Sequence, residues 1–274
     1  SVSDIFLHSI SKLGRRWQKR WGVLNALREF EMPLTNNSMY DTDGRLLLQF
    51  KLDSETLNER VGLMLNRADL HLTLYDLVRN DVDFRMGQEI ASLEQTSAGV
   101  EVTFRDGRRE TFDLVIGADG VHSKVREFVF GSGFERHMGY AYFAFMTKCP
   151  QVASTLGEHD LKIIRGDGFT IAYHPLKNGE VGAYVFHTEK AVEQITPQER
   201  REYILKTYGS FDKNFQAILE GMDKDEHIFH DGFTQIVMPQ WHKEKVCLIG
   251  DAAFCPTPAS GVGASMAMAA AYIL

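Results

Sequence analysis

Helical periodicity marks two segments of the chain. Between residues 9 and 29, apolar residues recur every three or four positions and basic residues occupy the opposite face, which predicts an amphipathic helix. The tryptophans of this segment lie on its apolar face, so the pattern favours packing over nucleic-acid binding. Residues 66–79 carry leucines and a valine at the same spacing and predict a second helix.

Short alternating and apolar runs predict strands. Residues 38–50 and 100–116 each contain an Asp-Gly pair, and Asp-Gly favours the tight turn of a β-hairpin. We therefore expect two hairpins, turning at residues 43–44 and 106–107. The run Leu-Val-Ile-Gly at 114–117 is apolar throughout, which predicts a strand covered on both faces.

The residue composition and the predicted elements change twice along the chain, and these changes predict its domains. Residues 135–237 are rich in aromatic, strand-like segments, whereas the chain near 245 returns to a buried strand followed by a small-residue helix. We expect a nucleotide-binding domain in two parts, 1–134 and 238–274, interrupted by a β-rich substrate domain at 135–237. Residues 36–62 are candidates to join the substrate sheet.

Composition and charge narrow the function classes. The net charge of −7 argues against a general nucleic-acid-binding protein, and no apolar run approaches the ~20 residues needed to span a bilayer. The three cysteines have neither disulfide-framework nor metal-site spacing, so we expect no metal and a reducing cytoplasm. The chain begins at Ser1 and stops in a helical pattern, which we interpret as an internal portion of a longer protein; the sequence indicates no oligomeric state.

The segment that follows the strand near 245 has candidate ligand-binding chemistry. Asp251 stands at the predicted strand end, where its carboxylate can accept hydrogen bonds from ribose hydroxyls. Pro258 belongs to a rigid turn, and Gly261 and Gly263 precede a helix whose N-terminus favours negative charge. A ligand-free strand–loop–helix crossover is the alternative.

A second acidic turn follows the strand at 114–117. Asp119 can accept a hydrogen bond from a ribose or from a backbone turn, and Gly120 permits close approach of a ligand. Ser123 can cap the helix expected after it. An Asx-type turn without a ligand is the alternative for this segment.

An arginine opens the predicted helix at 66–79. Arg67 can reach a phosphate with its forked donors. The alternative is a surface ion pair within the helix, with Asp69 or Asp76.

Three segments together resemble a known family. They read "DLVIGADGVHSKVRE" at 113–127, "VCLIGDAAFCPTPASGVGASMAMAAAYIL" at 246–274 and "LNRADLH" at 65–71. They are similar to motifs of the group A flavin-dependent monooxygenases, the aromatic-hydroxylase superfamily, and most of all to the branch with tetracycline-inactivating enzymes. The resemblance implies an α/β fold, in which a Rossmann-like FAD/NAD(P)-binding domain of the glutathione-reductase type is interrupted by a mostly antiparallel β-sheet substrate domain.

The resemblance also implies the cofactor and its contacts. FAD would be bound, with Asp251 near the ribityl or ribose hydroxyls and Arg67 near the phosphates. The turn at Asp119 would serve both the FAD and the NADPH pyrophosphate. The implied cofactor-binding residues are Arg67, Asp119, Gly120, Asp251, Pro258, Gly261, Val262 and Gly263.

The reaction implied by the family is hydroxylation of a small aromatic or polycyclic substrate. NADPH or NADH would reduce FAD, O₂ would add to give a flavin C4a-hydroperoxide, and no catalytic side chain is required. A flavin-dependent reductase or halogenase of the same fold is one alternative, although Trp17, Trp21 and Trp241 do not form the W-x-W-x-I-P stretch of halogenases. A non-catalytic remnant that has lost FAD binding is the other.

One departure from the family pattern is large. The G-x-G-x-x-G fingerprint that binds the FAD pyrophosphate does not occur in the sequence, nor does the acidic residue that follows it. We therefore expect the 274-residue chain by itself to bind FAD weakly or not at all.

Four residues of the middle region are candidates to contact a substrate: Phe145, Arg165, Tyr173 and His174. Core packing of a sheet is the alternative for each of them. Strand alternation places Tyr173 and His174 on opposite faces, so at most one of these two faces a bound flavin.

Overall fold

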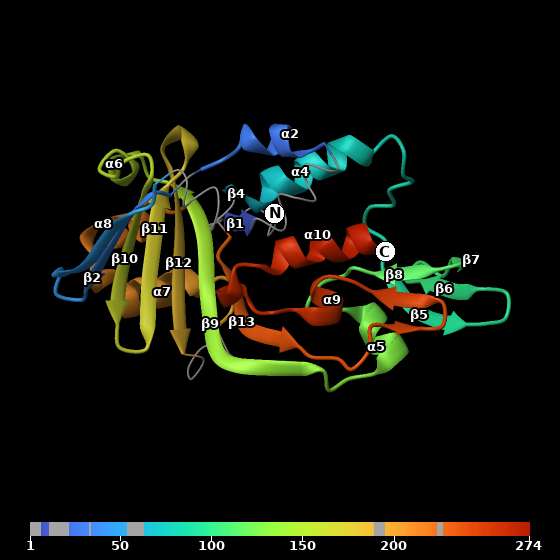
Figure 1. Cartoon of the computed structure of the whole chain (residues 1–274). Helices are drawn as coiled ribbons and strands as arrows, with labels where there is room; N and C mark the ends of the chain where they lie inside the picture. The colour runs from blue at the N-terminus through green and yellow to red at the C-terminus, as the bar shows by residue number, and fades with distance from the viewer. Residues whose placement is uncertain (1–6, 11–21, 33, 54–62, 189–194, 224–226) are drawn as a thin grey trace. The chain divides into compact units, whose positions relative to one another are not determined.

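The computed structural model describes residues 7–10, 22–32, 34–53, 63–188, 195–223 and 227–274. Helices are interspersed among runs of consecutive strands in a mixed α/β arrangement (Figure 1). The chain divides into two compact units, which are built from interleaved segments. Unit 1 comprises residues 1–12, 25–72 and 139–233, and unit 2 comprises residues 13–24, 73–138 and 234–274.

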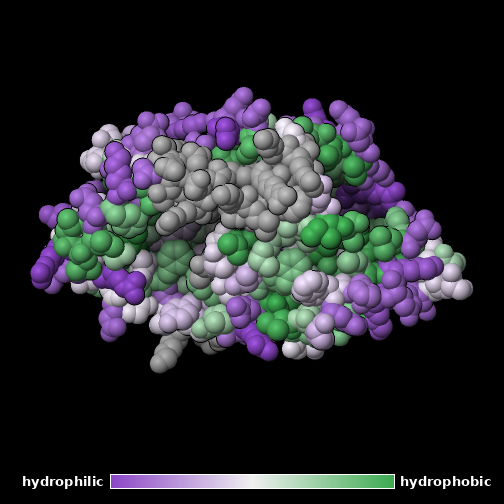
Figure 2. Space-filling view, viewed as in Figure 1, coloured by the Kyte–Doolittle hydropathy of each residue, from purple (hydrophilic) through white to green (hydrophobic). Residues whose placement is uncertain are grey.

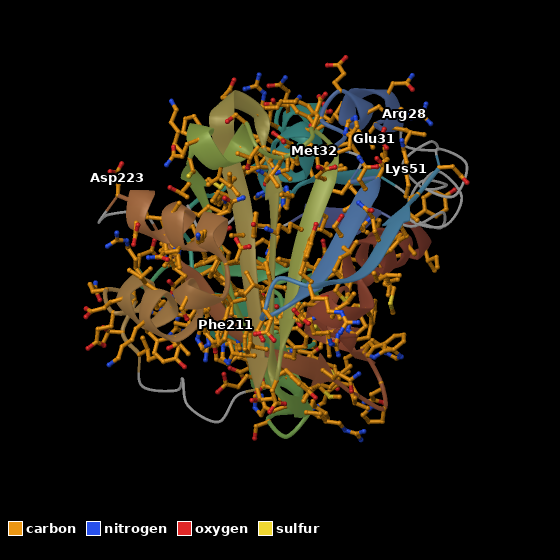
Figure 3. All side chains as sticks on the ribbon, turned by 90° about the vertical axis from the view of Figure 1, so that its left-hand side faces the viewer. Arg28, Glu31, Met32, Lys51, Phe211 and Asp223 are labelled. Atoms are coloured by element: carbon orange, nitrogen blue, oxygen red, sulfur yellow. The ribbon has the colours of Figure 1, made fainter. Side chains whose placement is uncertain are left out.

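A mixed sheet of seven strands forms the body of unit 1 (Figures 1 and 3). Its strand β2 is parallel to β10, whereas the pairs β2–β3, β10–β11, β11–β12 and β12–β9 are antiparallel. The expected antiparallel character of this region is therefore present. In sheet order the strands are β13 (Phe229–Ile236), β9 (Glu135–Lys148), β12 (Glu180–Thr188), β11 (Phe169–Pro175), β10 (Asp160–Gly166), β2 (Asn36–Asp41) and β3 (Leu46–Lys51).

Helices cover one face of this sheet and close its core. Phe145 and Tyr173 of the sheet are fully buried and pack against Phe215, which lies on α8. Such aromatic contacts bury large apolar areas and stabilise the layer. The short elements of this part are α6 (Pro150–Ala153), η3 (Lys177–Gly179), α7 (Arg200–Tyr208), η4 (Gly209–Phe211) and α8 (Lys213–Gly221).

The beginning of the chain differs from the expected helix at 9–29. Residues 9 and 10 belong to β1 (Leu7–Ile10), which pairs with β4 (Leu63–Asn66), and α2 covers Leu24–Arg28. One helix starting at residue 9 was therefore a wrong prediction, because pairing with a distant strand overrides the local period. Residues 11–21 lie outside the described residues. The helix expected at 66–79 is confirmed as α4 (Arg67–Val78).

Unit 2 contains two small sheets and the helices beside them. One sheet has the order β5-β6-β7, with β5 (Ile90–Gln95), β6 (Val100–Phe104) and β7 (Arg109–Phe112). The other has the order β14-β15-β8, with β14 (His242–Lys243), β15 (Val246–Leu248) and β8 (Val115–Gly117). The helical elements are α5 (Lys124–Phe130), α9 (Asp251–Phe254), η5 (Pro258–Ser260) and α10 (Gly263–Ile273).

Both expected hairpins are present, β2–β3 and β6–β7, each with a glycine of positive φ at its turn. The run at 114–117 differs from expectation. It forms β8 in a separate sheet, and Leu114 and Ile116 are 51% and 43% exposed, so the prediction of a strand covered on both faces is wrong for these residues. Among the described residues, no helix has the length and apolar composition needed to cross a membrane.

Candidate cofactor site

The two acidic turns of unit 2 follow neighbouring strands. β8 and β15 run parallel, with Gly117 opposite Leu248, and the N–H of Ile249 donates to the carbonyl of Gly117 at 3.0 Å. The turns at Asp119 and Asp251 therefore begin at the same end of the sheet, where both strands have their carboxyl ends. Carboxyl ends of parallel strands are the usual place for ligands in open α/β sheets. The structure thus brings the two predicted motifs together.

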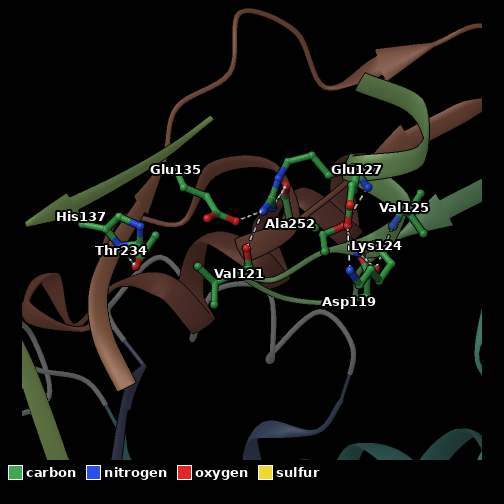
Figure 4. A network of polar contacts seen from close by, with 11 residues as sticks. Asp119, Val121, Lys124, Val125, Glu127, Glu135, His137, Thr234 and Ala252 are labelled. Carbon is green, nitrogen blue, oxygen red and sulfur yellow. Dashed lines mark hydrogen bonds and ion pairs between the residues drawn. The ribbon is translucent and has the colours of Figure 1, made fainter. Parts of the chain in front are cut away.

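The carboxylate of Asp119 binds the start of its own helix. It accepts hydrogen bonds from the Ser123 hydroxyl and from the backbone N–H groups of Lys124 (2.8 Å) and Val125 (3.1 Å) (Figure 4). Ser123 caps α5 as expected, because its Oγ accepts from the N–H of Arg126 at 2.9 Å. These contacts reach residues 123–125, farther along the chain than the Asx-type turn considered as the alternative for Asp119. A cofactor contact by Asp119 stays a prediction.

Sequence reasoning missed Arg126, which holds the two turns together. Its guanidinium is buried and donates to the carbonyls of Val121 (2.6 Å) and Ala252 (3.0 Å) and to the Glu135 carboxylate (2.9 Å) (Figure 4). Val121 belongs to the first turn and Ala252 to α9 after the second. One side chain therefore fixes both turns, and nothing in the sequence distinguishes Arg126 from the charged residues Lys124 and Glu127 of the same helix.

Asp251 is exposed and lies beside the start of α10. A side chain at Gly263, the first residue of α10, would stand 3.6 Å from the Asp251 carboxylate. Gly250 has a positive φ of 57°, and a Cβ there would approach the Cβ of Ala267 to 3.2 Å. Glycine at 250 therefore lets α10 pack against the end of β15, which places the carboxylate next to the positive N-terminus of an eleven-residue helix.

The loop between α9 and α10 carries unusual backbone geometry. Thr257 has φ 82° and ψ 152°, a region that is costly for any residue with a Cβ, and Gly261 is left-handed at φ 65°. Pro258 is exposed, and Val262 and Gly263 are half-buried. Strain of this kind often accompanies binding sites, and no pattern in the residues around Thr257 indicates it.

Arg67 is the first residue of α4 and belongs to unit 1. Its side chain is exposed, and no ion pair to it occurs in the part of the chain that the structure describes. Asp76, one partner considered for it, instead pairs with Arg79 at 3.3 Å. A phosphate contact by Arg67 stays a prediction.

Two of the candidate substrate residues lie in the core of unit 1. Phe145 and Tyr173 are fully buried, and the Tyr173 hydroxyl donates to Asp212 at 2.8 Å. Asp212 also accepts from Lys162 at 2.8 Å and caps α8. Core packing therefore accounts for both aromatic side chains, and we do not retain them as substrate contacts.

His174 and Arg165 lie elsewhere on the same sheet. His174 stacks on Tyr184, whereas Tyr173 packs with Phe215, so the two neighbours face opposite sides as expected. His174 is 1% exposed, and burial lowers its pKa to about 4. Its Nδ1 lies 3.2 Å from the Pro175 carbonyl, so Nδ1 carries the proton of a neutral ring. Arg165 is exposed on β10.

A family model described as an FAD binding domain matches residues 29–274. The chain belongs to the FAD binding domain family. The resemblance to group A flavin-dependent monooxygenases is thereby confirmed, and FAD is the cofactor that the family supports.

Relatives of this FAD binding domain include proteins named as flavin-dependent monooxygenases. A flavin-dependent monooxygenase of Legionella longbeachae is 28% identical over 262 residues, covering 93% of this chain and 66% of that protein. The 2-heptyl-3-hydroxy-4(1H)-quinolone synthase of Pseudomonas aeruginosa is 28% identical over 257 residues, covering 92% of this chain and 65% of that protein. The chain thus spans about two thirds of the length of these curated relatives.

Solved structures confirm the expected fold class. The tetracycline destructase Tet(51) superposes with a TM-score of 0.80 at 27% identity, covering all of this chain and 71% of that chain. HpxO of Klebsiella pneumoniae in complex with FAD superposes with a TM-score of 0.80 at 23% identity, covering 97% of this chain and 70% of the HpxO chain. At this identity the similarity shows the fold alone. The FAD binding domain is therefore of the Rossmann-like class with a mostly antiparallel sheet.

Proposed function

We propose that this chain forms part of the FAD site of a monooxygenase that hydroxylates a small aromatic or polycyclic substrate with electrons from NADPH or NADH. One observation carries the proposal: the Asp251 carboxylate and the start of α10 lie together, at a sheet edge that Arg126 makes rigid. The FAD binding domain family and its monooxygenase relatives support it.

The residues at this edge suit the parts of a flavin. Asp251 offers acceptors for ribose or ribityl hydroxyls, while Gly261 and Gly263 allow a flat ring near the backbone. The N-terminus of α10 stabilises negative charge that builds up on such a ring. When bound, FAD supplies the redox chemistry with O₂, and the protein positions it and excludes water.

The substrate class is proposed from the relatives and from unit 1. Two relatives are named for a quinolone and for tetracycline, which are fused-ring compounds. Of the four candidate side chains, Arg165 is exposed, and its guanidinium has no ion-pair partner among the described residues. We therefore propose Arg165 as the substrate contact to test first. His174 stays a second candidate, as a neutral hydrogen-bond acceptor.

The direct test is to purify the protein as its gene encodes it. We expect a yellow protein with flavin absorbance, and NADPH or NADH oxidation that consumes O₂ and rises when a fused-ring aromatic substrate is added. A colourless protein that takes up no added FAD would sink the proposal and favour a non-catalytic remnant.

The variant Asp251→Ala tests the residue that carries the proposal. Leaving the hydroxyl partners of a carboxylate unpaired costs about 1–3 kcal/mol, so FAD affinity should fall roughly 10- to 100-fold in a fluorescence titration. Asp113→Ala, another exposed acid of unit 2, is the matched control and should keep full affinity. Equal FAD retention in both variants would remove Asp251 from the site.

A further inference from the structure

The outer strand of the unit 1 sheet, β3, is apolar and exposed. Leu46, Leu47 and Leu48 are 47%, 51% and 50% exposed, and Phe50 is 41% exposed. Hydrophobic residues gather over the β2–β3 hairpin at the left of Figure 2, and Figure 3 shows Lys51 on the outermost strand. Edge strands of this kind are templates for pairing unless charge, proline or a bulge protects them.

The register of β3 shows which backbone groups point away from the sheet. The N–H of Leu52 donates to the carbonyl of Thr35 at 2.8 Å, so the backbone N–H and C=O groups of Leu52 point toward β2. Hydrogen-bonded and non-bonded positions alternate in an antiparallel ladder, and therefore Phe50 and Leu48 also face β2. The N–H and C=O groups of Gln49 and Lys51 then point outward, and within the described residues they have no backbone partner.

A bulge restricts where a further strand can pair. Met39 lies opposite Leu48 and Tyr40 opposite Leu46, which leaves Leu47 as the extra residue of β3. A bulge interrupts the ladder locally, so regular outward pairing is confined to residues 48–52.

This segment is complementary to itself in one antiparallel register. When Gln49 of one copy lies opposite Lys51 of another, both outward positions of each strand form hydrogen-bonded pairs. Phe50 then meets its own copy at the two-fold axis, and Leu48 lies opposite Leu52 on the same face. Moving the axis to Lys51 would place like charges together, and moving it to Gln49 would use the bulged Leu47.

We propose that β3 pairs with β3 of a second copy of this chain, joining two seven-stranded sheets across an axis at Phe50. The occupant is a second copy because the same short segment satisfies both sides of the register, as an isologous contact requires. Stable interfaces bury about 800 Å² on each partner, and one strand supplies less, so the dimer should be weak and concentration-dependent.

Sedimentation of the protein as its gene encodes it, over a range of concentrations, tests the pairing. We expect a reversible monomer–dimer equilibrium that Gln49→Pro weakens at least tenfold, because proline removes an outward N–H and leaves the β2 ladder intact. Gln49→Ala is the matched control and should dimerise like the parent. A chain that stays monomeric at the highest concentrations, or a dimer unaffected by Gln49→Pro, overturns the proposal.

Cross-linking tests the register independently of affinity. Directly opposed non-bonded residues have Cα atoms about 4.5 Å apart, which is within disulfide range. Phe50→Cys should therefore give a covalent dimer on mild oxidation, whereas Leu47→Cys, which lies far from its own copy, should not. Equal cross-linking of the two variants, or none at Phe50→Cys, contradicts an axis at Phe50.

Discussion

Asp119 and Asp251 follow the carboxyl ends of two adjacent parallel strands, yet their surroundings differ. The carboxylate of Asp119 takes hydrogen bonds from a hydroxyl and two backbone N–H groups of its own helix. Asp251 is exposed beside the glycine that opens α10. The same signal, an acid and a glycine after a strand, thus describes a turn held by hydrogen bonds to its own helix and a carboxylate next to a helix N-terminus.

The difference assigns separate tasks to two similar motifs. Asp119 stabilises the loop that Arg126 then joins to α9, while Asp251 lies beside the start of α10, where we propose that FAD binds. Single substitutions around the two turns should therefore change the free energy of unfolding and the affinity for FAD to different extents.

Arg126→Met should have the largest effect, because it removes the side chain that serves both turns. Two carbonyls and a carboxylate lose their buried donor, so the free energy of unfolding should fall by about 3 kcal/mol in denaturant titration, and FAD affinity should fall with it. Lys124→Met removes an exposed ion pair with Glu127 and should change stability by less than about 0.5 kcal/mol. Equal effects of the two variants would show that Arg126 does not hold the turns.

Asp119→Ala should distinguish the role of the Asp119 turn from that of the Asp251 turn most clearly. Loss of a helix cap costs about 1–2 kcal/mol of unfolding free energy, while FAD affinity should stay close to that of the parent, opposite to Asp251→Ala. Asp119→Asn keeps an acceptor and should restore most of the stability. A fall in FAD affinity for Asp119→Ala without a loss of stability would instead make Asp119 a cofactor contact.

Thr257→Gly should have the smallest effect and of the opposite sign. A glycine adopts φ 82° without the strain of a Cβ, so the unfolding free energy should rise by about 1 kcal/mol. Thr257→Ala keeps the Cβ and serves as the control, with little or no gain. If both variants behave alike, backbone strain at 257 is not a source of instability.

Local chemistry in the sequence predicted the local structure well. Asp-Gly pairs located both hairpin turns, leucine spacing located α4, and Ser123 caps α5 as its position suggested. Non-local pairing was out of reach: residues 9 and 10 belong to a strand because β4, more than fifty residues later, supplies its partner. Exposure of Ile116 likewise depends on what lies beside β8, which a run of apolar letters does not encode.

The candidate site was predictable in outline but not in its supports. The family resemblance placed Asp119 and Asp251 in one cofactor site, and the two strands that precede them do pair side by side. The reach of Arg126 across 126 residues to Ala252 leaves no periodic signal. Phe145 and Tyr173 were predicted as substrate contacts but are buried in the core. Aromatic side chains occur both in cores and in ligand sites, so residue type alone does not distinguish the two.

The close approach of Gly250 and Ala267 has a consequence for natural variation. A Cβ at 250 would stand 3.2 Å from the Ala267 methyl group, and the φ of 57° would strain any residue that carries a Cβ there. Viable descendants of this sequence should therefore keep glycine at 250. A library that randomises the codons of residues 250 and 267 together should recover glycine at 250, whichever residue it accepts at 267.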